Sequence, residues 1–273
     1  MELNAAIAAL ARDPNAPFDV GELALLLARE EYPDLDVEAY LGELAGMTRE
    51  ARNYLGGTFS GQVRGLCRYL FHEMGYRGNK QDYYDPRNSY LSQVMDRRTG
   101  IPISLSVLTM ALGQRLGMTI AGIGLPGHFI VKAVERDRQI LFDPFHGGRE
   151  LKFDDCENLV RQVTGKAFEA NCATLCGLPL AQIVARLLTN LKVIYLKREE
   201  YPKAARVISR LWQLSPEDQR ERRDLGSVLL KLGHMGQAID HLRAYLESSA
   251  VVPDSESVQQ LLDKACSEIC KWN

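Results

Sequence analysis

The 273-residue sequence predicts an α+β fold that is mostly helical, with a small antiparallel sheet packed on a buried helix and paired helices after it. Three observations carry this prediction. Residues 102–116 are apolar almost all round, which is typical of a central buried helix. Three short β-rich runs follow that segment. The C-terminal part then repeats a helical pattern with a period of 34 residues.

The first sixty residues carry the recurring apolar pattern of helices. Apolar side chains are spaced as in a helix over residues 5–12, over residues 20–32 and after Asp36. A fourth apolar stripe predicts a helix over residues 62–74. We therefore expect an N-terminal helical region over residues 1–60, with the fourth helix opening the next domain.

The charge changes sign between the first two parts of the chain. Residues 1–60 hold eleven acidic and four basic residues, whereas residues 61–120 hold eight basic and four acidic ones. The basic stretch could attract an acidic substrate or partner, or it could pair with the acidic N-terminal helices. The formal net charge of only −2 argues against a nucleic-acid binder.

The predicted core domain, residues 61–177, is built around the buried helix. A polar loop over residues 75–89 and a short helix through Met95 lead to it. Pro102 suits the first turn of the buried helix, and Gly117 suits its C-terminal end. The β-rich runs that follow are separated by turn residues and cover residues 119–125, 129–134 and 139–142. They predict the small antiparallel sheet packed on the helix.

Residues 178–273 are predicted to form a helical repeat domain. The spacing from Tyr201 to Met235 and from Ala204 to Ala238 is 34 residues in both cases. Paired helices with this period resemble tetratricopeptide repeats, and two pairs plus a terminal helix over residues 255–270 fit the length. An ordinary helical bundle is the alternative. Because such repeats present an extended surface, we expect a protein or peptide partner there.

The sequence also excludes several classes of protein. No apolar run reaches the ~20 residues that a membrane span needs. The N-terminal stretch carries Glu2 and lacks the basic start of a signal peptide, so we expect a cytoplasmic protein without membrane contact. No glycine-rich phosphate loop or dinucleotide fingerprint is present, and we expect no cofactor.

The cysteine pattern does not indicate a metal site. Cysteines stand at positions 67, 156, 172, 176, 266 and 270, and no pair has the C-x-x-C spacing. Cysteine-based metal sites need further Cys or His ligands close by in the sequence. We therefore expect free thiols and no bound metal.

One pair of residues has the chemistry of a catalytic dyad. His128 begins one predicted strand and Asp143 ends the next, and a hairpin folded halfway between them brings the two side chains together. A carboxylate beside an imidazole fixes its tautomer and stabilises its charged form. The free amides at the N-terminus of the buried helix, near Pro102 and Ser104, favour developing negative charge.

The motifs around these residues resemble the SirB1 family, which joins a transglutaminase-like, papain-like core to tetratricopeptide repeats. The resemblance covers most of the chain after about residue 60. It is carried by long motifs in the same order: Gly78-Asn79, Tyr83-Tyr84-Asp85-Pro86-Arg87-Asn88-Ser89-Tyr90-Leu91, Asp96-Arg97-Arg98-Thr99-Gly100-Ile101-Pro102-Ile103-Ser104-Leu105, Gly124-Leu125-Pro126-Gly127-His128-Phe129 and Asp143-Pro144-Phe145-His146-Gly147-Gly148.

The resemblance implies a nucleophilic cysteine at the start of the buried helix, where this chain has none. Alignment on Gly100 puts Pro102 at that position, or Ser104 after a shift of two residues. One hypothesis is therefore a hydrolase or acyltransferase that acts on an amide or ester through Ser104, His128 and Asp143. The other, which we favour, is a non-catalytic interaction or regulatory protein in which Ser104 only caps the helix.

Several further residues are candidates for a pocket beside the dyad. Polar and aromatic loop residues and an arginine ahead of the buried helix could bind a small ligand, and a histidine follows Asp143 in the sequence. These pocket candidates are Asn79, Tyr83, Tyr84, Asn88, Arg97, Pro102 and His146. The same side chains could equally hold the loops to the core by hydrogen bonds. The sequence leaves the oligomeric state open.

Overall fold

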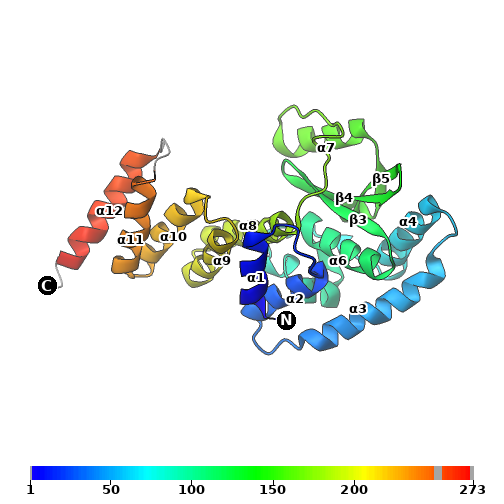
Figure 1. Ribbon diagram of the computed structural model, residues 1–273, viewed down its shortest axis with the longest axis horizontal. Coiled ribbons are helices and arrows are strands. Elements are labelled where there is room, and N and C mark those ends of the chain that lie inside the picture. The colour runs from blue at the N-terminus through cyan, green and yellow to red at the C-terminus, as the bar shows by residue number, and fades with distance from the viewer. Residues whose placement is uncertain (1, 249–253, 271–273) are drawn as a thin grey trace. The chain divides into compact units, whose positions relative to one another are not determined.

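The computed structural model describes residues 2–248 and 254–270 (Figure 1). The chain divides into two compact units. The core unit comprises residues 2–6 and 14–187, and the repeat unit comprises residues 7–13 together with the described residues from 188 onward. Helices α1 (Leu3–Arg12) and α8 (Leu180–Lys197) each contribute to both units. Among the described residues, no helix is long and apolar enough to cross a membrane.

Two of the helices expected near the N-terminus begin at aspartate caps. Helix α2 (Val20–Glu31) starts after Asp19, whose carboxylate accepts the main-chain N–H of Glu22 at 2.9 Å. Helix α3 (Val37–Ala51) starts after Asp36 in the same way. Both caps satisfy amides that have no partner inside the helix. The apolar stripe of α2 is buried, which explains why the sequence pattern marks it so clearly.

The helix predicted over residues 62–74 is correct in place but not uniform in type. Helix α4 (Phe59–Cys67) is α-helical, and the chain then continues as a π-helical segment, η2 (Arg68–Glu73). The apolar spacing predicts one regular helix here, and the structure differs. A π-helical turn shifts the hydrogen-bonding register by one residue, and apolar spacing alone does not reveal it.

The predicted polar loop holds short elements of its own. Strand β1 (Arg77–Gly78) pairs in parallel with β2 (Thr99–Gly100), and a 3₁₀ turn, η3 (Pro86–Asn88), lies between them. Helix α5 (Leu91–Arg97) follows the turn. The first residues of the loop are therefore hydrogen-bonded to the segment that precedes the central helix.

Helix α6 (Pro102–Arg115) is the central helix that the sequence predicts. Every residue from Pro102 to Gly113 is buried. A helix that is apolar on all sides needs neighbours on all sides, and α6 packs against α2, α3, α5 and strands β3 (Thr119–Leu125) and β4 (His128–Glu135). It is the core around which the unit is assembled.

The four-stranded sheet has the simple order β3-β4-β5-β6, all antiparallel. Strand β5 (Arg138–Asp143) is the third predicted strand, whereas β6 (Arg149–Leu151) is an addition to the prediction. One face of the sheet lies on α6. The other face is covered by α7 (Phe153–Thr164), through a second apolar cluster that includes Ile130 and Cys156 (Figure 1). The sheet is thus buried on both faces.

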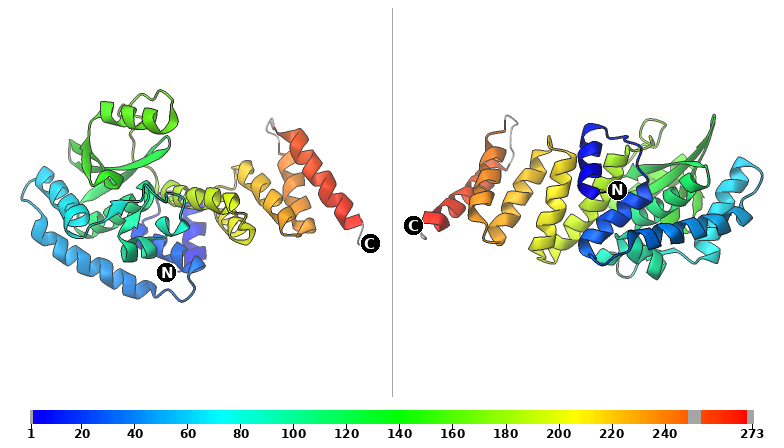
Figure 2. Two further views of the ribbon diagram at one scale, coloured as in Figure 1. Left: turned by 180° about the vertical axis from the view of Figure 1, so that it is seen from behind. Right: turned by 60° about the horizontal axis from the view of Figure 1, so that its bottom comes forward.

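The repeat unit consists of consecutive helices that pack on their neighbours in the chain. In Figure 2 they follow one another in a row from yellow to red. They are α9 (Tyr201–Leu214), α10 (Gln219–Lys231), α11 (Met235–Leu246) and α12 (Ser255–Cys270), after the second half of α8. Leu242 and Tyr245 of α11 and Val258 and Leu262 of α12 form one apolar cluster of this unit. The pairwise packing is that of a helical repeat array.

Candidate functional site

The ends of two adjacent strands bring His128 and Asp143 together. His128 is the first residue of β4, and Asp143 is the last residue of β5. His128 Nε2 lies 2.9 Å from Asp143 Oδ2, and both side chains are buried. The hairpin between the strands fixes this contact through its register, in which Val131 faces Phe142.

A second imidazole reaches the same carboxylate oxygen. His146 is the last residue of a 3₁₀ turn, η4 (Pro144–His146), that begins directly after Asp143. Its Nδ1 lies 2.7 Å from Asp143 Oδ2, and its ring stacks on that of His128 with 5.8 Å between the centroids. The His146 side chain is 35% exposed, so it forms the solvent side of the cluster.

The other oxygen of Asp143 is held by the main chain. The N–H groups of Phe145 and His146 donate to Oδ1 at 2.9 and 3.4 Å. Burial alone would raise the pKa of Asp143, but the hydrogen bonds from His128 and His146 outweigh it and hold the pKa well below its usual range. Asp143 is therefore a firmly ionised carboxylate that accepts hydrogen bonds on both oxygens.

Ser104 lies in the first turn of α6, where its hydroxyl bonds to the main chain. The hydroxyl accepts the N–H of Ile101 at 3.0 Å, and it donates toward the carbonyl oxygens of Asn88, at 2.5 Å, and Ile101, at 3.2 Å. Among the residues that the structure describes, no hydrogen bond joins Ser104 to His128. Pro102 occupies the first position of the helix and is buried. The arrangement is that of a helix cap.

Asn88 organises the polar loop in front of α6. Its side-chain oxygen accepts from Asn79 at 3.1 Å and from Arg97 at 3.4 Å, and its amide nitrogen donates to the carbonyl oxygens of Asp82 and Tyr83. Asn88 itself is fully buried. Three of the pocket candidates are thus joined in one hydrogen-bonded network that closes the loop.

Arg97 and the two tyrosines differ in how they relate to the dyad. The guanidinium of Arg97 also pairs with the buried carboxylate of Asp85 at 3.2 Å. The ring of Tyr83 contacts that of Phe145 edge-on at 6.3 Å, and Phe145 in turn contacts His128 at 5.9 Å. Tyr84 is half exposed beside Tyr83. Tyr83 is therefore linked to the dyad through one ring, whereas Tyr84 faces solvent.

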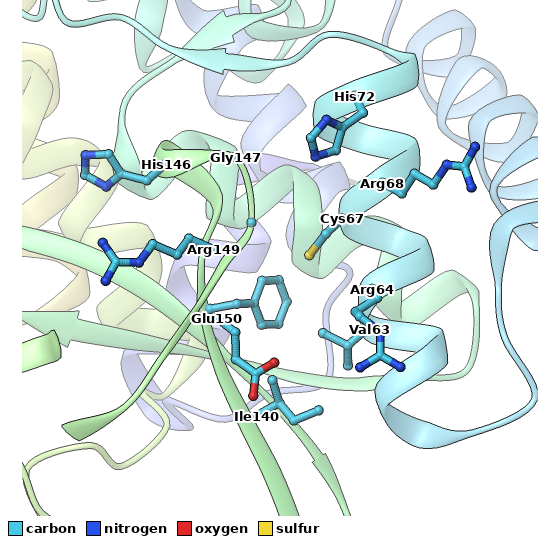
Figure 3. Close-up of a pocket in the computed structure, with 12 residues that line it drawn as sticks. Val63, Arg64, Cys67, Arg68, His72, Ile140, His146, Gly147, Arg149 and Glu150 are labelled. Carbon is cyan, nitrogen blue, oxygen red and sulfur yellow. The ribbon is translucent and has the colours of Figure 1, made fainter. Parts of the chain in front are cut away.

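Two cavities open on either side of His146. One, of about 680 Å³, lies between α4 with η2 on one side and β5 with the turn after it on the other. Figure 3 shows that Arg64, Arg68 and His72 belong to the helical side of this cavity, whereas Arg149 and Glu150 belong to the strand side. The second cavity, of about 460 Å³, is lined by Asp143 and His146 together with residues of β6 and α7. Both cavities give solvent access to the cluster.

Cys67 lies in the wall of the larger cavity, close to the candidate site, although its position in the sequence does not indicate this. Its sulfur points from α4 toward the hairpin (Figure 3), and a Cβ added to Gly148 would lie 2.7 Å from it. Burial raises the pKa of Cys67 to about 12, and Glu150 adds to the effect. Such a thiol is not a thiolate nucleophile. Only the fold brings it near, since 76 residues of sequence separate Cys67 from Asp143.

Comparisons with known proteins agree with this architecture. The profile of the transglutaminase-like superfamily matches residues 38–189, and a tetratricopeptide-repeat profile matches residues 191–263. The UPF0162 protein of Xylella fastidiosa (strain Temecula1) is 38% identical over 82% of each chain. The UPF0162 protein of Vibrio cholerae is 30% identical over 88% of this chain and 90% of that protein.

Two more distant matches concern proteins of other names. Human F-box only protein 21 is 28% identical over 159 residues, which are 55% of this chain and 21% of that protein. A crystal structure of menin aligns with a TM-score of 0.43 at 12% identity, over 95% of this chain and 74% of that chain. The likeness to menin is weak and decides nothing about the fold. The profile matches, by contrast, confirm the core and the repeats that the sequence predicts.

Proposed function

Since the chain belongs to the transglutaminase-like superfamily and to the family of UPF0162 proteins, with tetratricopeptide repeats behind its core, we propose that it is a non-catalytic protein that works through protein interactions. The observation that carries the proposal is the start of α6. The family chemistry would need a nucleophile there, and the residues at that place are Pro102 and Ser104. We expect the protein to act in the cytoplasm.

The hydrogen bonds of Ser104 support a structural role. Its single proton is directed at main-chain carbonyl oxygens, of which that of Asn88 is the nearer, and its lone pair accepts the N–H of Ile101. A serine becomes nucleophilic when a general base accepts its proton. Ser104 would have to give up buried hydrogen bonds before His128 could serve as that base.

Cys67 does not replace the missing nucleophile in this proposal. Its thiol is buried, and its raised pKa of about 12 leaves it protonated at neutral pH. The dyad of His128 and Asp143 then braces the end of the hairpin. The pocket candidates around Asn88 close the loop in front of α6 and keep the core rigid.

A partner would bind through the repeat unit. Trp212 of α9, Arg222 of α10 and His241 of α11 come from successive helices and contact one another. The Arg222 guanidinium lies 5.3 Å from the Trp212 ring, and the rings of Trp212 and His241 are 5.3 Å apart. All three are partly exposed. Tryptophan and arginine are the residue types that most often dominate the binding energy of protein interfaces.

A second candidate function is a hydrolase or acyltransferase for an amide or ester. The 2.9 Å contact between His128 and Asp143 favours it, because a carboxylate in this position orients an imidazole for proton transfer. Ser104 would be the nucleophile, His128 the base and Asp143 the orienting group. The pocket candidates would then position the substrate.

Active-site labelling separates the two functions. A fluorophosphonate probe reports a nucleophilic serine, and iodoacetamide reports a reactive thiol. We expect neither to modify Ser104 or Cys67 of the folded protein at neutral pH. Fluorophosphonate labelling that is lost in Ser104→Ala but kept in Ser106→Ala would overturn the non-catalytic proposal in favour of the enzyme.

The interaction half of the proposal needs its own measurement. Proteins cross-linked to the full chain in its native cells should be lost when Arg222 is replaced by alanine, because the cation over Trp212 is removed. Arg243→Ala, at an exposed position of α11, is the matched control and should retain them. If the Arg222 and Arg243 variants recover the same cross-linked proteins in equal amounts, binding at Trp212 and Arg222 is contradicted.

A further inference from the structure

Three potential metal ligands converge at the end of the hairpin. They are an imidazole nitrogen of His128, a carboxylate oxygen of Asp143 and an imidazole nitrogen of His146, and these atoms all lie within 4.8 Å of one another. The nitrogens are 2.9 and 2.7 Å from the shared oxygen. We propose that these residues bind one divalent transition-metal ion, a role that goes beyond the interaction function and does not depend on it.

The spacing suits a shared ion. Zinc–nitrogen and zinc–oxygen distances are about 2.0–2.2 Å, so two ligands of one ion can be at most roughly 4.2 Å apart. The nitrogen–oxygen separations already lie within that limit. The two imidazole nitrogens lie within 4.8 Å of each other. Where their separation exceeds the limit, His146 would move, because it is partly exposed and ends a short turn, whereas His128 stays on its strand. The ion would take the place of the two N–H protons that now point at Asp143.

The ligand types select a class of metal. Two imidazoles and one carboxylate suit zinc, iron, cobalt or nickel, whereas calcium and magnesium prefer sets of oxygen ligands. Zinc is the natural probe, and cobalt can replace it to give a visible spectrum.

The surroundings hold the ligands in place. Asp143 Oδ1 accepts main-chain N–H groups of Phe145 and His146, which leaves Oδ2 aimed at the imidazoles. The carbonyl oxygen of Asp143 accepts the N–H of Gly148 at 2.8 Å, so the turn closes on itself. Outer hydrogen bonds of this kind orient metal ligands and raise affinity.

The smaller cavity supplies room beyond the three ligands. It has a volume of about 460 Å³ and is lined by Asp143 and His146. Asn158 and Gln162 of α7 also line it. Three protein ligands beside an open cavity match a site with an open coordination position for water or a small ligand. The cysteine spacing gave no sign of a metal site, because these three ligands are two histidines and an aspartate that the hairpin brings together.

The test is a metal titration of the full chain. We expect Zn²⁺ to bind with one ion per chain by calorimetry, and Co²⁺ to give d–d absorption without the charge-transfer band of a cobalt–thiolate bond. His146→Ala removes an exposed ligand with little risk to folding and should weaken Zn²⁺ binding by tenfold or more. Asp143→Asn should do the same.

Two variants serve as controls. His72→Ala removes an exposed histidine that lines only the larger cavity, and it should leave Zn²⁺ affinity unchanged. Cys67→Ser tests whether the thiol in that cavity is a ligand, and it should also be neutral. The proposal is overturned by the absence of Zn²⁺ binding, by full affinity in His146→Ala, or by a thiolate band that disappears in Cys67→Ser.

Discussion

The hydroxyl of Ser104 lies 2.5 Å from the carbonyl oxygen of Asn88, sixteen residues earlier in the chain. This bond ties the end of η3 to the first turn of α6, and the same hydroxyl accepts the N–H of Ile101 at 3.0 Å. The side-chain oxygen of Asn88 in turn accepts hydrogen bonds from Asn79 and Arg97. The position at which a nucleophile would be sought is thus a junction between the loop and the central helix.

Ser104→Ala should therefore destabilise the protein. The substitution leaves the buried groups of Asn88 and Ile101 without this partner, and we expect a loss of about 1–3 kcal/mol in the free energy of unfolding. Ser106, two residues along the same helix, is the matched control. Its buried hydroxyl has no hydrogen-bond partner among the described residues, so Ser106→Ala should be neutral or slightly stabilising. Denaturant unfolding of both variants checks this, and equal effects would contradict the capping role.

A second prediction concerns Asp85, whose carboxylate is buried in the same loop. Burial would raise its pKa, but hydrogen bonds from Arg87 and the charge of Arg97 outweigh it and lower the pKa below its usual range. A folded-state pKa below the unfolded value of about 3.9 stabilises the protein above that pH. The stabilisation is lost as the pH falls below about 4, through the folded-state pKa.

Asp85→Asn should accordingly cost about 1–3 kcal/mol at pH 7, and the difference from the unmodified protein should shrink as the pH falls below about 4. Asp82→Asn, at an exposed carboxylate of the same loop, should show little difference at any pH. Free energies of unfolding measured across pH 2.5–7 provide the comparison. A cost for Asp85→Asn that is constant with pH would show that the ionised carboxylate is not what stabilises the loop.

The main elements of the fold could be predicted because their patterns are local. The apolar stripe of α2, the all-round apolar sequence of α6 and the 34-residue repeat each follow from burial of neighbouring residues. The pairing of β1 with β2 and the π-helical turn η2 depend on distant contacts and on main-chain hydrogen bonding. Side-chain spacing does not encode either of them.

The candidate site shows the same division. The contact of His128 with Asp143 follows from a hairpin whose turn lies midway between them, so it could be predicted. The bond from Ser104 to Asn88 ends on a main-chain carbonyl, which is present in every residue and leaves no mark in the sequence. Cys67 enters the cavity wall from a helix far away in the chain. Such contacts appear only once the elements are packed.

The turn after Asp143 allows a third prediction, from two adjacent glycines. Gly147 and Gly148 both adopt positive φ, of 73° and 76°. A Cβ on Gly147 would meet nothing within 4 Å, whereas one on Gly148 would lie 2.7 Å from Cys67 and 2.8 Å from Phe71. Gly147→Ala should cost only the left-handed backbone conformation, roughly 1–2 kcal/mol.

Gly148→Ala adds a steric clash to the same backbone cost, and we expect a further loss of about 1–3 kcal/mol. Thermal unfolding of the two variants makes the comparison directly. The double variant Gly148→Ala with Cys67→Ala should recover only part of the additional loss, because it removes the sulfur while the Cβ of residue 67, also 2.7 Å from the new methyl group, remains. Equal melting temperatures for the two single variants would contradict close packing of this turn on α4.

The last prediction concerns a buried cation in the repeat unit. Lys192 of α8 is almost fully buried, and its Nζ lies 2.6 Å from both Glu221 and Asp224 of α10. Lys192→Met keeps the aliphatic length but removes the cation between the two carboxylates, so that Glu221 loses this ion pair while Asp224 keeps the one with Arg223 at 2.6 Å. We expect a cost of roughly 2–4 kcal/mol in the free energy of unfolding. Amide hydrogen exchange should speed up in α8 and α10. Lys231→Met, at an exposed position of α10, is the control and should leave amide hydrogen exchange unchanged. Equal protection from exchange in the Lys192 and Lys231 variants would show that the ion pairs do not hold these helices together.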